Sequence, residues 1–161
     1  MTQASVTIRE AAQGEAALCE EILRSLPAWF GIEAAIVSYR GDIEAMETLV
    51  ADRGGAVLGF LTLKTHNPHT AEIQVMAVRR EEQGRGIGAA LVRHAEALLL
   101  ARACDYLEVK TLGPSHPNED YARTRGFYSA MGFLPVEEND LWGDSNPCLI
   151  MIKHLRCARD C

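Results

Sequence analysis

The pattern of hydrophobic and polar positions predicts a succession of short strands and amphipathic helices. Runs rich in β-branched and aromatic residues predict strands at Val6–Arg9, Thr48–Ala51, Ala56–Lys64, Ala71–Val78, Tyr106–Thr111, Phe133–Glu137 and Cys148–His154. Apolar residues at helical spacing predict helices at Gly14–Leu26, Ile32–Tyr39, Ala89–Arg102 and Asn118–Met131. The predicted order is therefore β-α-α-β-β-β-α-β-α-β-β.

The connections between these elements predict a mixed α/β sheet flanked by helices. Gly54-Gly55 joins two strand-like runs, which indicates an antiparallel hairpin, and His66–His69 forms the next predicted turn. The strand-helix-strand succession over Ile73–Thr111 implies one parallel pair. No repeat or linker interrupts the chain, so we expect one domain over residues 1–161, with an ordered core at about 5–155.

Composition and charge narrow the class of protein. The chain is 48% apolar and 24% charged, which is ordinary for a globular protein. Its net charge of −6 argues against nucleic acid as the main partner, because phosphate contacts need clustered Lys and Arg. No apolar run approaches the roughly 20 residues that span a bilayer, and the N-terminus does not resemble a signal peptide. We expect a cytoplasmic protein without a membrane partner.

The cysteine pattern does not predict a metal site. The five cysteines are spaced irregularly, and Cys157 and Cys161 form a C-x3-C pair without a second pair. A zinc site normally shows four ligands in two close pairs. We therefore expect no metal, and we expect Cys19, Cys104 and Cys148 to be buried as small apolar residues.

The glycine-rich segment Gln83–Gly88 carries the strongest functional signal. It follows the apolar run Ile73–Val78 and precedes the predicted helix Ala89–Arg102. Glycines let backbone N–H groups approach a ligand, and the start of a helix attracts anions. The pattern predicts a site for the pyrophosphate of a nucleotide-bearing cofactor; the alternative is that the glycines only form a tight turn.

Two other nucleotide-binding motifs fit this segment less well. Gly84-x-Gly86-x-x-Ala89 matches the dinucleotide pattern formally, and Glu108 lies about 20 residues further on. That pattern requires glycines directly after the strand, whereas Arg79–Gln83 intervenes here. A phosphate-binding P-loop is excluded because no Gly-Lys-Ser/Thr follows.

The chain resembles the GNAT superfamily of acyl-CoA-dependent N-acetyltransferases. The family signature Gln/Arg-x-x-Gly-x-Gly/Ala is met by Gln83, Gly86 and Gly88. The strand Ala71–Val78 resembles the family's central strand. The resemblance implies the GNAT-type fold, a mostly antiparallel sheet with one splayed parallel pair, over nearly the whole chain.

A second motif strengthens the resemblance. The family's later helix usually ends Tyr-x-x-x-Gly-Phe, which here is Tyr128 followed by Gly132 and Phe133. The resemblance implies an enzyme that moves an acetyl group from acetyl-CoA to a primary amine, by direct attack in a ternary complex. It also makes a homodimer plausible. The alternatives are a non-catalytic acyl-CoA-binding or regulatory module and a transferase for a larger acyl group.

The resemblance assigns residues to the co-substrate. A bulged central strand would hold pantetheine through the backbone of Met76, Ala77 and Val78. The pyrophosphate would lie on the turn formed by Gln83, Gly84, Arg85, Gly86, Ile87 and Gly88. The usual CoA-contacting Asn is replaced by Tyr121, so either Asn118 substitutes for it or Tyr121 stacks on the cofactor.

The resemblance also implies two catalytic residues. Glu72 matches the position of a catalytic base, which an attacking amine needs because it is protonated at pH 7. Tyr128 matches the general acid that protonates the departing thiolate. The alternatives are that Glu72 is a solvated charge at a strand end, with a water chain as base, and that Tyr128 simply packs beside Phe127 and Met131.

Aromatic residues and histidines in the variable segments are the candidates for contact with the acceptor. They are Trp29, Phe30, Tyr39, His66, His116 and Trp142. Aromatic residues at such positions more often belong to a core than to a site. The sequence does not distinguish a small-molecule amine from a protein amino group as the acceptor.

Overall fold

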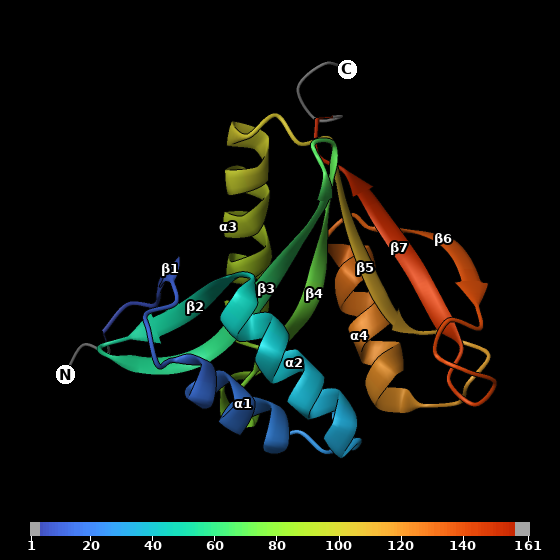
Figure 1. Cartoon of the computed structure of the whole chain (residues 1–161), viewed down its shortest axis with the longest axis horizontal. Coiled ribbons are helices and arrows are strands. Elements are labelled where there is room, and N and C mark those ends of the chain that lie inside the picture. Colours follow the sequence, from blue (N-terminus) through green and yellow to red (C-terminus); the bar gives the residue numbers. More distant parts are fainter. Residues whose placement is uncertain (1–3, 157–161) are drawn as a thin grey trace. The chain divides into compact units, whose positions relative to one another are not determined.

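A computed structural model of the chain describes residues 4–156, and Figure 1 shows its elements. The strands are β1 (Thr7–Glu10), β2 (Glu47–Arg53), β3 (Ala56–Asn67), β4 (Thr70–Val78), β5 (Tyr106–Leu112), β6 (Leu134–Asn139) and β7 (Cys148–His154). The helices are α1 (Ala16–Arg24), α2 (Glu33–Ala45), α3 (Ile87–Ala101) and α4 (Glu119–Ala130), with a 3-10 turn η1 at Arg80–Glu82. The predicted order is confirmed, and η1 is added to it. The Cys157/Cys161 pair lies outside the described residues.

The strands form a seven-stranded sheet in the order β1-β2-β3-β4-β5-β7-β6. The pairs β1–β2, β2–β3, β5–β7 and β6–β7 are antiparallel, whereas β4 and β5 are parallel. The parallel ladder joins Thr70–Ile73 to Tyr106–Val109, although both strands continue beyond it. The predicted fold class, a mixed sheet with one parallel pair, is confirmed.

The chain divides into two compact units. The first unit contains the residues up to Lys64 together with Gln74–Leu98, and the second contains Thr65–Ile73 together with the residues from Leu99 onward. The strands β3 and β4 and the helix α3 each begin in one unit and end in the other.

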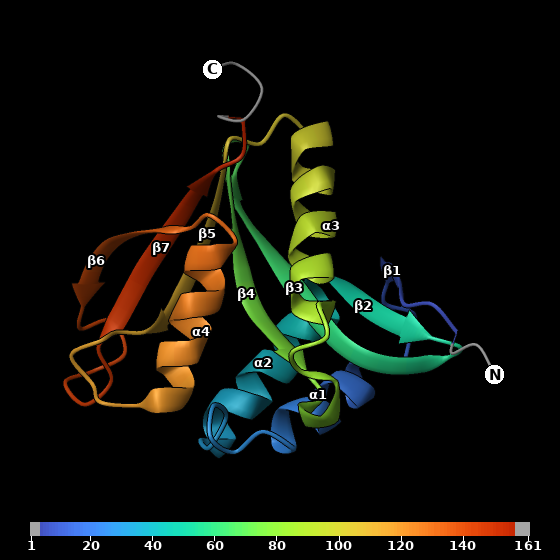
Figure 2. The ribbon, with the colours of Figure 1, turned by 180° about the vertical axis from the view of Figure 1, so that it is seen from behind.

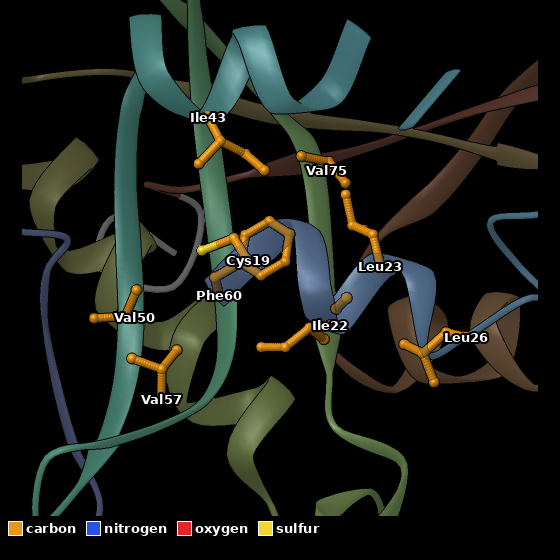
Figure 3. Close-up of a cluster of buried hydrophobic side chains, with 10 residues drawn as sticks. Cys19, Ile22, Leu23, Leu26, Ile43, Val50, Val57, Phe60 and Val75 are labelled. Atoms are coloured by element: carbon orange, nitrogen blue, oxygen red, sulfur yellow. The ribbon is translucent and has the colours of Figure 1, made fainter. Parts of the chain in front are cut away.

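In the first unit, helices cover both faces of the strands. Helices α1 and α2 lie on one face of β2 and β3, and α3 lies on the opposite face, as the two views in Figures 1 and 2 agree. Figure 3 shows the core beneath α1, where Cys19, Ile22 and Leu23 pack with Phe60 and Val75. Phe60 is fully buried. Burying such a side chain contributes roughly 1.5–3 kcal/mol to folding.

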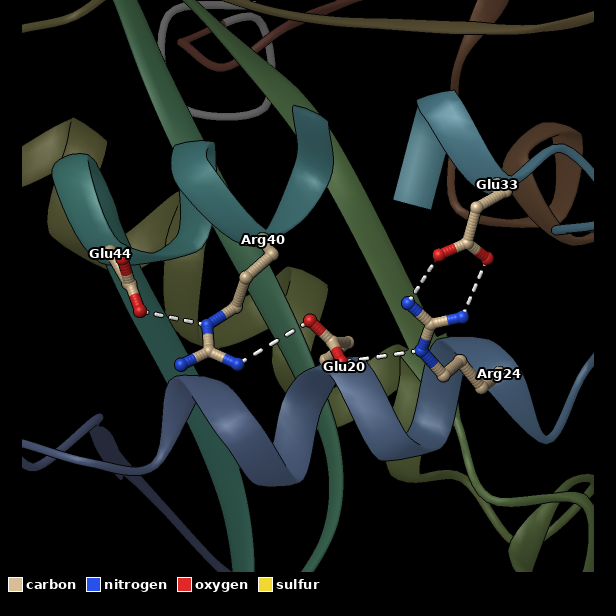
Figure 4. A network of polar contacts seen from close by, with 5 residues as sticks. All are labelled: Glu20, Arg24, Glu33, Arg40 and Glu44. Atoms are coloured by element: carbon tan, nitrogen blue, oxygen red, sulfur yellow. Dashed lines mark hydrogen bonds and ion pairs between the residues drawn. The ribbon is translucent and has the colours of Figure 1, made fainter. Parts of the chain in front are cut away.

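Ion pairs join α1 to α2 at the surface of the first unit, as Figure 4 shows. Arg24 binds Glu33 through two bonds of 2.6 and 2.8 Å and also contacts Glu20 at 3.2 Å. Arg40 lies between Glu44 at 2.8 Å and Glu20 at 3.4 Å. Water and salt screen exposed pairs of this kind, so the network orients the two helices more than it stabilises them.

In the second unit, β5 pairs with β7 along its whole length and α4 lies against it. Side chains alternate along β5: Leu107 and Val109 are buried, whereas Glu108 and Lys110 on the other face are half-buried. Arg125 on α4 donates from Nη1 to the carbonyl of Leu112 at 2.7 Å. This bond ties the helix to the end of the strand.

Two predicted boundaries are wrong. His66 lies in β3 and not in the turn, which is formed by Pro68 and His69. Asn67, the last residue of β3, closes this turn: its Oδ1 accepts the backbone N–H groups of His69 and Thr70 at 2.8 and 3.0 Å. Helix α2 continues past Tyr39 to Ala45. Gly41 lies inside it, at a propensity cost of about 1 kcal/mol that does not end the helix.

Glu15 is tied into the first unit by three bonds to one carboxylate. It accepts from Arg9 Nη1 and Nη2 at 2.7 and 2.8 Å, and from the N–H of Ala12 at 2.6 Å. The bonds from Arg9 outweigh the opposing effect of burial, and they lower the pKa of Glu15 from 4.5 to about 2. The carboxylate therefore stabilises the fold above pH 4.5, and this stabilisation is lost as the pH falls through about 2.

We expect Glu15→Gln to lower the free energy of unfolding by about 1–3 kcal/mol at pH 7, because charge-assisted hydrogen bonds are lost. The difference from the wild type should vanish as the pH approaches 2, where the wild-type carboxyl group is itself protonated. Urea unfolding across this pH range measures it. The matched control is Glu33→Gln, which removes a similar bidentate pair to Arg24 but with a 68% exposed side chain, so we expect a much smaller loss of stability than for Glu15→Gln. A pH-independent difference for Glu15→Gln would contradict this assignment.

Candidate functional site

The glycine turn of the first unit has the backbone that its sequence requires. Gly84 and Gly86 have φ angles of 76° and 85°, a region that side chains disfavour. A Cβ built on either residue would meet no atom within 4 Å. The backbone conformation at these positions therefore requires glycine, whereas crowding by neighbouring atoms does not. The space beside both residues is open.

The turn is fastened to the adjacent strands. Arg79 donates its backbone N–H to the carbonyl of Leu58 and its Nε to the carbonyl of Val57, both at 2.8 Å. Gln83 donates from Nε2 to the carbonyl of Val78 at 3.1 Å. The side chain of Gln83, which was expected beside the pyrophosphate, thus holds the last carbonyl of β4 and closes the turn.

Arg85 is an exposed cation beside the turn. Glu82 accepts from Arg53 Nη1 at 2.9 Å, and Arg85 Nη1 lies 3.7 Å from its other carboxylate oxygen. The side chain of Arg85 is 57% exposed. Since Arg53 already pairs with Glu82, Arg85 can turn to an anionic ligand at little cost.

The end of β4 packs tightly on β3. A Cβ on Gly59 would lie 2.9 Å from the carbonyl oxygen of Ala77 and 3.2 Å from Val78 Cγ2. Ala77 is buried, whereas Met76 and Val78 alternate with it and are half-buried. The predicted bulge and pantetheine contacts at these three residues stay predictions.

In the second unit, Glu72 is the centre of a cluster of charged side chains. Its Oε1 lies 2.7 Å from His66 Nε2 and 2.8 Å from Lys110 Nζ, and Lys110 Nζ lies 3.1 Å from Glu108 Oε1. Glu72 is only 4% exposed. The alternative that Glu72 is a solvated charge at a strand end is therefore wrong. The cluster also brings the candidate acceptor residue His66 to the candidate base.

Lys110 supplies the positive charge of this cluster. Burial alone would lower the pKa of Lys110, but hydrogen bonds to Glu72 and Glu108 outweigh it and raise the pKa above its usual value. The donor atoms of His66, Glu72 and Glu108 lie within 4.8 Å of one another, close enough for metal ligands. Because the ammonium bonds both carboxylates, the geometry is that of an ion network.

Helix α4 carries Tyr128 and is preceded by Asn118. The ring of Tyr128 is buried and packs edge-on against Phe127 and Phe133, with centroids 5.3 and 5.5 Å away. The Oδ1 of Asn118 accepts the N–H of Tyr121 at 3.1 Å and so caps the helix. The acid role of Tyr128, and the alternative CoA contacts of Asn118 and Tyr121, stay predictions.

The remaining acceptor candidates divide between core and surface. Trp29, Phe30 and Tyr39 are partly buried against the core of the first unit, and the rings of Phe30 and Tyr39 meet edge-on at 6.0 Å. In the second unit, His116 has a buried Nδ1 without a hydrogen-bond partner among the described residues, and Trp142 is 40% exposed between β6 and β7.

The described cysteines are buried free thiols, as predicted: Cys19, Cys104 and Cys148. Burial raises the pKa of Cys19 to about 12. For Cys148, burial raises the pKa of the thiol and Lys110 partly opposes this. Neither thiol is therefore prepared to act as a nucleophile.

Glu108 and Lys110 are the members of the cluster that sequence reasoning missed. Their alternation with buried residues places them on one face of a strand, and this signal was visible. Their contact with Glu72 depends on the parallel register, which pairs Glu72 with Glu108. The register between two strands this far apart in the chain cannot be predicted from the sequence of either strand alone.

Comparison with known proteins gives the family. Residues 16–133, from the first residue of α1 to the residue before β6, match the Acetyltransferase (GNAT) family. The chain belongs to the GNAT family. The resemblance predicted from the glycine and tyrosine motifs is confirmed.

Two curated relatives share part of this GNAT chain. Mycothiol acetyltransferase from Beutenbergia cavernae is 38% identical over 96 residues, which are 59% of this chain and 30% of the relative. An uncharacterized N-acetyltransferase from Chlorobaculum tepidum is 31% identical over 103 residues, 62% of this chain and 59% of the relative. The matched region thus spans less than two thirds of either relative.

A solved structure shares the GNAT fold. The aminoglycoside 6′-N-acetyltransferase complexed with coenzyme A superposes with a TM-score of 0.71 at 16% identity, covering 92% of this chain and 97% of that one.

Within residues 4–156 no helix is long and apolar enough to cross a bilayer.

We expect Gly86→Ala to destabilise the GNAT chain by roughly 1–2 kcal/mol, because φ at this position is 85° and alanine avoids that region. Gly126→Ala is the matched control: Gly126 lies inside α4, has open space around it and no positive φ. This change should stabilise by roughly 0.5–1 kcal/mol. Urea unfolding measures both, and equal effects of the two substitutions would contradict the strained turn.

Proposed function

We propose that this protein is an N-acetyltransferase that moves an acetyl group from acetyl-CoA to a primary amine. The observation that carries the proposal is the glycine turn before α3, with positive φ at Gly84 and Gly86 and open space beside both. Backbone N–H groups at a helix start bind phosphate groups without a special side chain. Because the chain belongs to the GNAT family, we assign the bound phosphate groups to CoA.

The co-substrate would be held by residues of the first unit. The N–H groups of Gly84–Gly88 would bind the pyrophosphate, and exposed Arg85 would pair with it. The backbone of Met76, Ala77 and Val78 would hold the pantetheine arm in the manner of an added strand. The coenzyme A in the solved aminoglycoside 6′-N-acetyltransferase supports this assignment of the ligand.

Transfer would be direct, without an acyl-enzyme. A covalent route needs a reactive nucleophile, and burial raises the pKa of both Cys19 and Cys148. The amine would attack the thioester carbonyl in a ternary complex. Glu72 would help to remove a proton from the amine, and Tyr128 would protonate the departing sulfur.

The acceptor is a small-molecule amine or a protein amino group. The matched relative from Beutenbergia cavernae is named mycothiol acetyltransferase, which favours a small molecule. The net charge of −6 is compatible with a cationic acceptor. A cytoplasmic location and a homodimer remain predictions that accompany this proposal.

We expect acetyl-CoA and CoA to raise the melting temperature by about 5–10 °C when each is present at about 100 times its Kd, because a ligand of the native state stabilises it by mass action. NAD and ATP at equal concentration should have a much smaller effect. Differential scanning fluorimetry measures the four shifts. Stabilisation by NAD and not by CoA would refute the assignment.

Arg85→Gln should weaken CoA binding about 10-fold, since one charge-assisted hydrogen bond to phosphate is lost. Its matched control is Arg123→Gln. Arg123 is also well exposed, at 68%, and is paired with an acidic residue three positions before it, Asp120. The control should bind CoA as the wild type does.

Tyr128→Phe should lower turnover about 10-fold or more while leaving the Kd for CoA nearly unchanged, because it removes only the proposed proton donor to the sulfur. Release of free thiol in an amine screen measures turnover, and calorimetry measures Kd. Phe127→Leu, which alters the neighbouring ring without removing a hydroxyl, is the packing control. Equal losses of turnover in Tyr128→Phe and Phe127→Leu would show that Tyr128 contributes only to packing.

A further inference from the structure

We infer that His66 is the immediate proton acceptor for the amine, and that Glu72 is the positioning residue that holds its ring. The inference rests on the proposed function and deepens it. It follows from the geometry of the four-residue cluster in the second unit, which contains His66, Glu72, Glu108 and Lys110.

Glu72 is poorly placed to meet an amine itself. Its side chain is 6% exposed, and its Oε1 already lies 2.8 Å from the ammonium of Lys110 and 2.7 Å from His66 Nε2. The side chain of His66 is 30% exposed, the most accessible in the cluster. An incoming amine therefore reaches His66 more readily than the carboxylate.

The carboxylate selects the tautomer of the imidazole. Because Glu72 pairs with the ammonium of Lys110, it is an acceptor, and His66 Nε2 must donate to it. In the neutral ring the lone pair is then on Nδ1. Among residues 4–156, the contacts of His66 with Glu72 and Glu108 all involve Nε2, which leaves Nδ1 available as a base with respect to these residues.

The other charged members of the cluster are unsuited to the role. Hydrogen bonds to the carboxylates overcome burial and raise the pKa of Lys110, so its amine stays protonated. Glu108 is 16% exposed at its side chain and is bound to Lys110 at 3.1 Å. His66 remains, because a neutral imidazole carries a basic nitrogen that can accept a proton.

The step balances as follows. The substrate ammonium loses one proton to Nδ1 of His66, and the freed lone pair forms the C–N bond at the acetyl carbonyl carbon. The C–S bond breaks, and the sulfur leaves with its electron pair and takes a proton from the hydroxyl of Tyr128. As the C–S bond breaks, the nitrogen of the new amide loses its second proton to solvent. The imidazolium of His66 then returns its proton to solvent, and the phenolate of Tyr128 takes one proton back from solvent, so each turnover releases one proton in all.

The first test is the pH–rate profile of His66→Gln. The Gln amide can still donate to Glu72 but has no basic nitrogen, so the fold should persist while kcat falls about 100-fold or more and the acidic limb of kcat disappears. Glu72→Gln should shift that limb and lower kcat by less. Melting temperatures and CoA affinity of both variants check folding and co-substrate binding.

His69 provides a matched control on the same hairpin. It also pairs with a carboxylate at 2.7 Å, that of Asp105, but through Nδ1, and its side chain is 73% exposed. His69→Gln should leave kcat and its pH profile unchanged. A similar loss in His69→Gln and His66→Gln would show that the hairpin is merely perturbed, and would overturn the inference.

The second test reads the tautomer without any turnover. Ring ¹⁵N chemical shifts of the neutral side chains should show His66 protonated at Nε2 and His69 protonated at Nδ1. The preference at His66 should weaken in Glu72→Gln. A neutral His66 ring protonated at Nδ1 overturns the inference even if the enzyme is active.

The outcomes separate this inference from the proposed function. If the wild type transfers acetyl groups and His66→Gln keeps its rate and acidic limb, the proposed function stands and the role of His66 is wrong. If the wild type neither binds CoA nor releases thiol with any amine, the proposed function is wrong and the proton-acceptor role falls with it. The ¹⁵N shifts would then still decide the pairing of His66 with Glu72.

Discussion

The parallel ladder between β4 and β5 is the constraint that accounts for both the crossover with the glycine turn and the charge cluster of the second unit. Parallel strands cannot be joined by a hairpin, so the chain that leaves β4 must cross over before it returns as β5. The crossover contains the glycine turn and α3, which supply the proposed phosphate site. The same ladder sets Glu72 opposite Glu108. One strand pairing therefore requires the crossover that carries the glycine turn, and it sets the two carboxylates of the charge cluster opposite each other.

Two carboxylates opposite each other in a ladder repel, and a buried one must be compensated. Lys110, two residues after Glu108 on the same face of β5, is positioned to bond both. Losing one partner of a buried ion pair costs about 3–5 kcal/mol, because the remaining charge is left without a partner. This cost gives the cluster one stable arrangement, in which Glu72 has a fixed orientation toward His66.

Features set by neighbouring residues could be predicted from the sequence, and features set by register could not. Alternation and helical spacing gave the element order correctly, and the glycines at 84 and 86 gave the turn because positive φ is a local requirement. The end of β3 was misjudged at His66, since the turn depends on bonds of Asn67 to its own backbone neighbours. The contact of Glu72 with Lys110 joins residues 38 apart, and only the folded ladder brings them together.

The charge of the cluster explains why a histidine fits there. Two carboxylates and one ammonium leave a single negative charge on Glu72, Glu108 and Lys110 together. A neutral His66 leaves that charge in place, whereas an imidazolium cancels it. Proton transfer from an attacking amine to His66 would therefore neutralise the cluster, so the new charge forms beside carboxylates that are already oriented and needs little reorganisation. If Glu72 accepted the proton instead, it would lose part of its ion pair with Lys110, and it is therefore a poorer proton acceptor than His66.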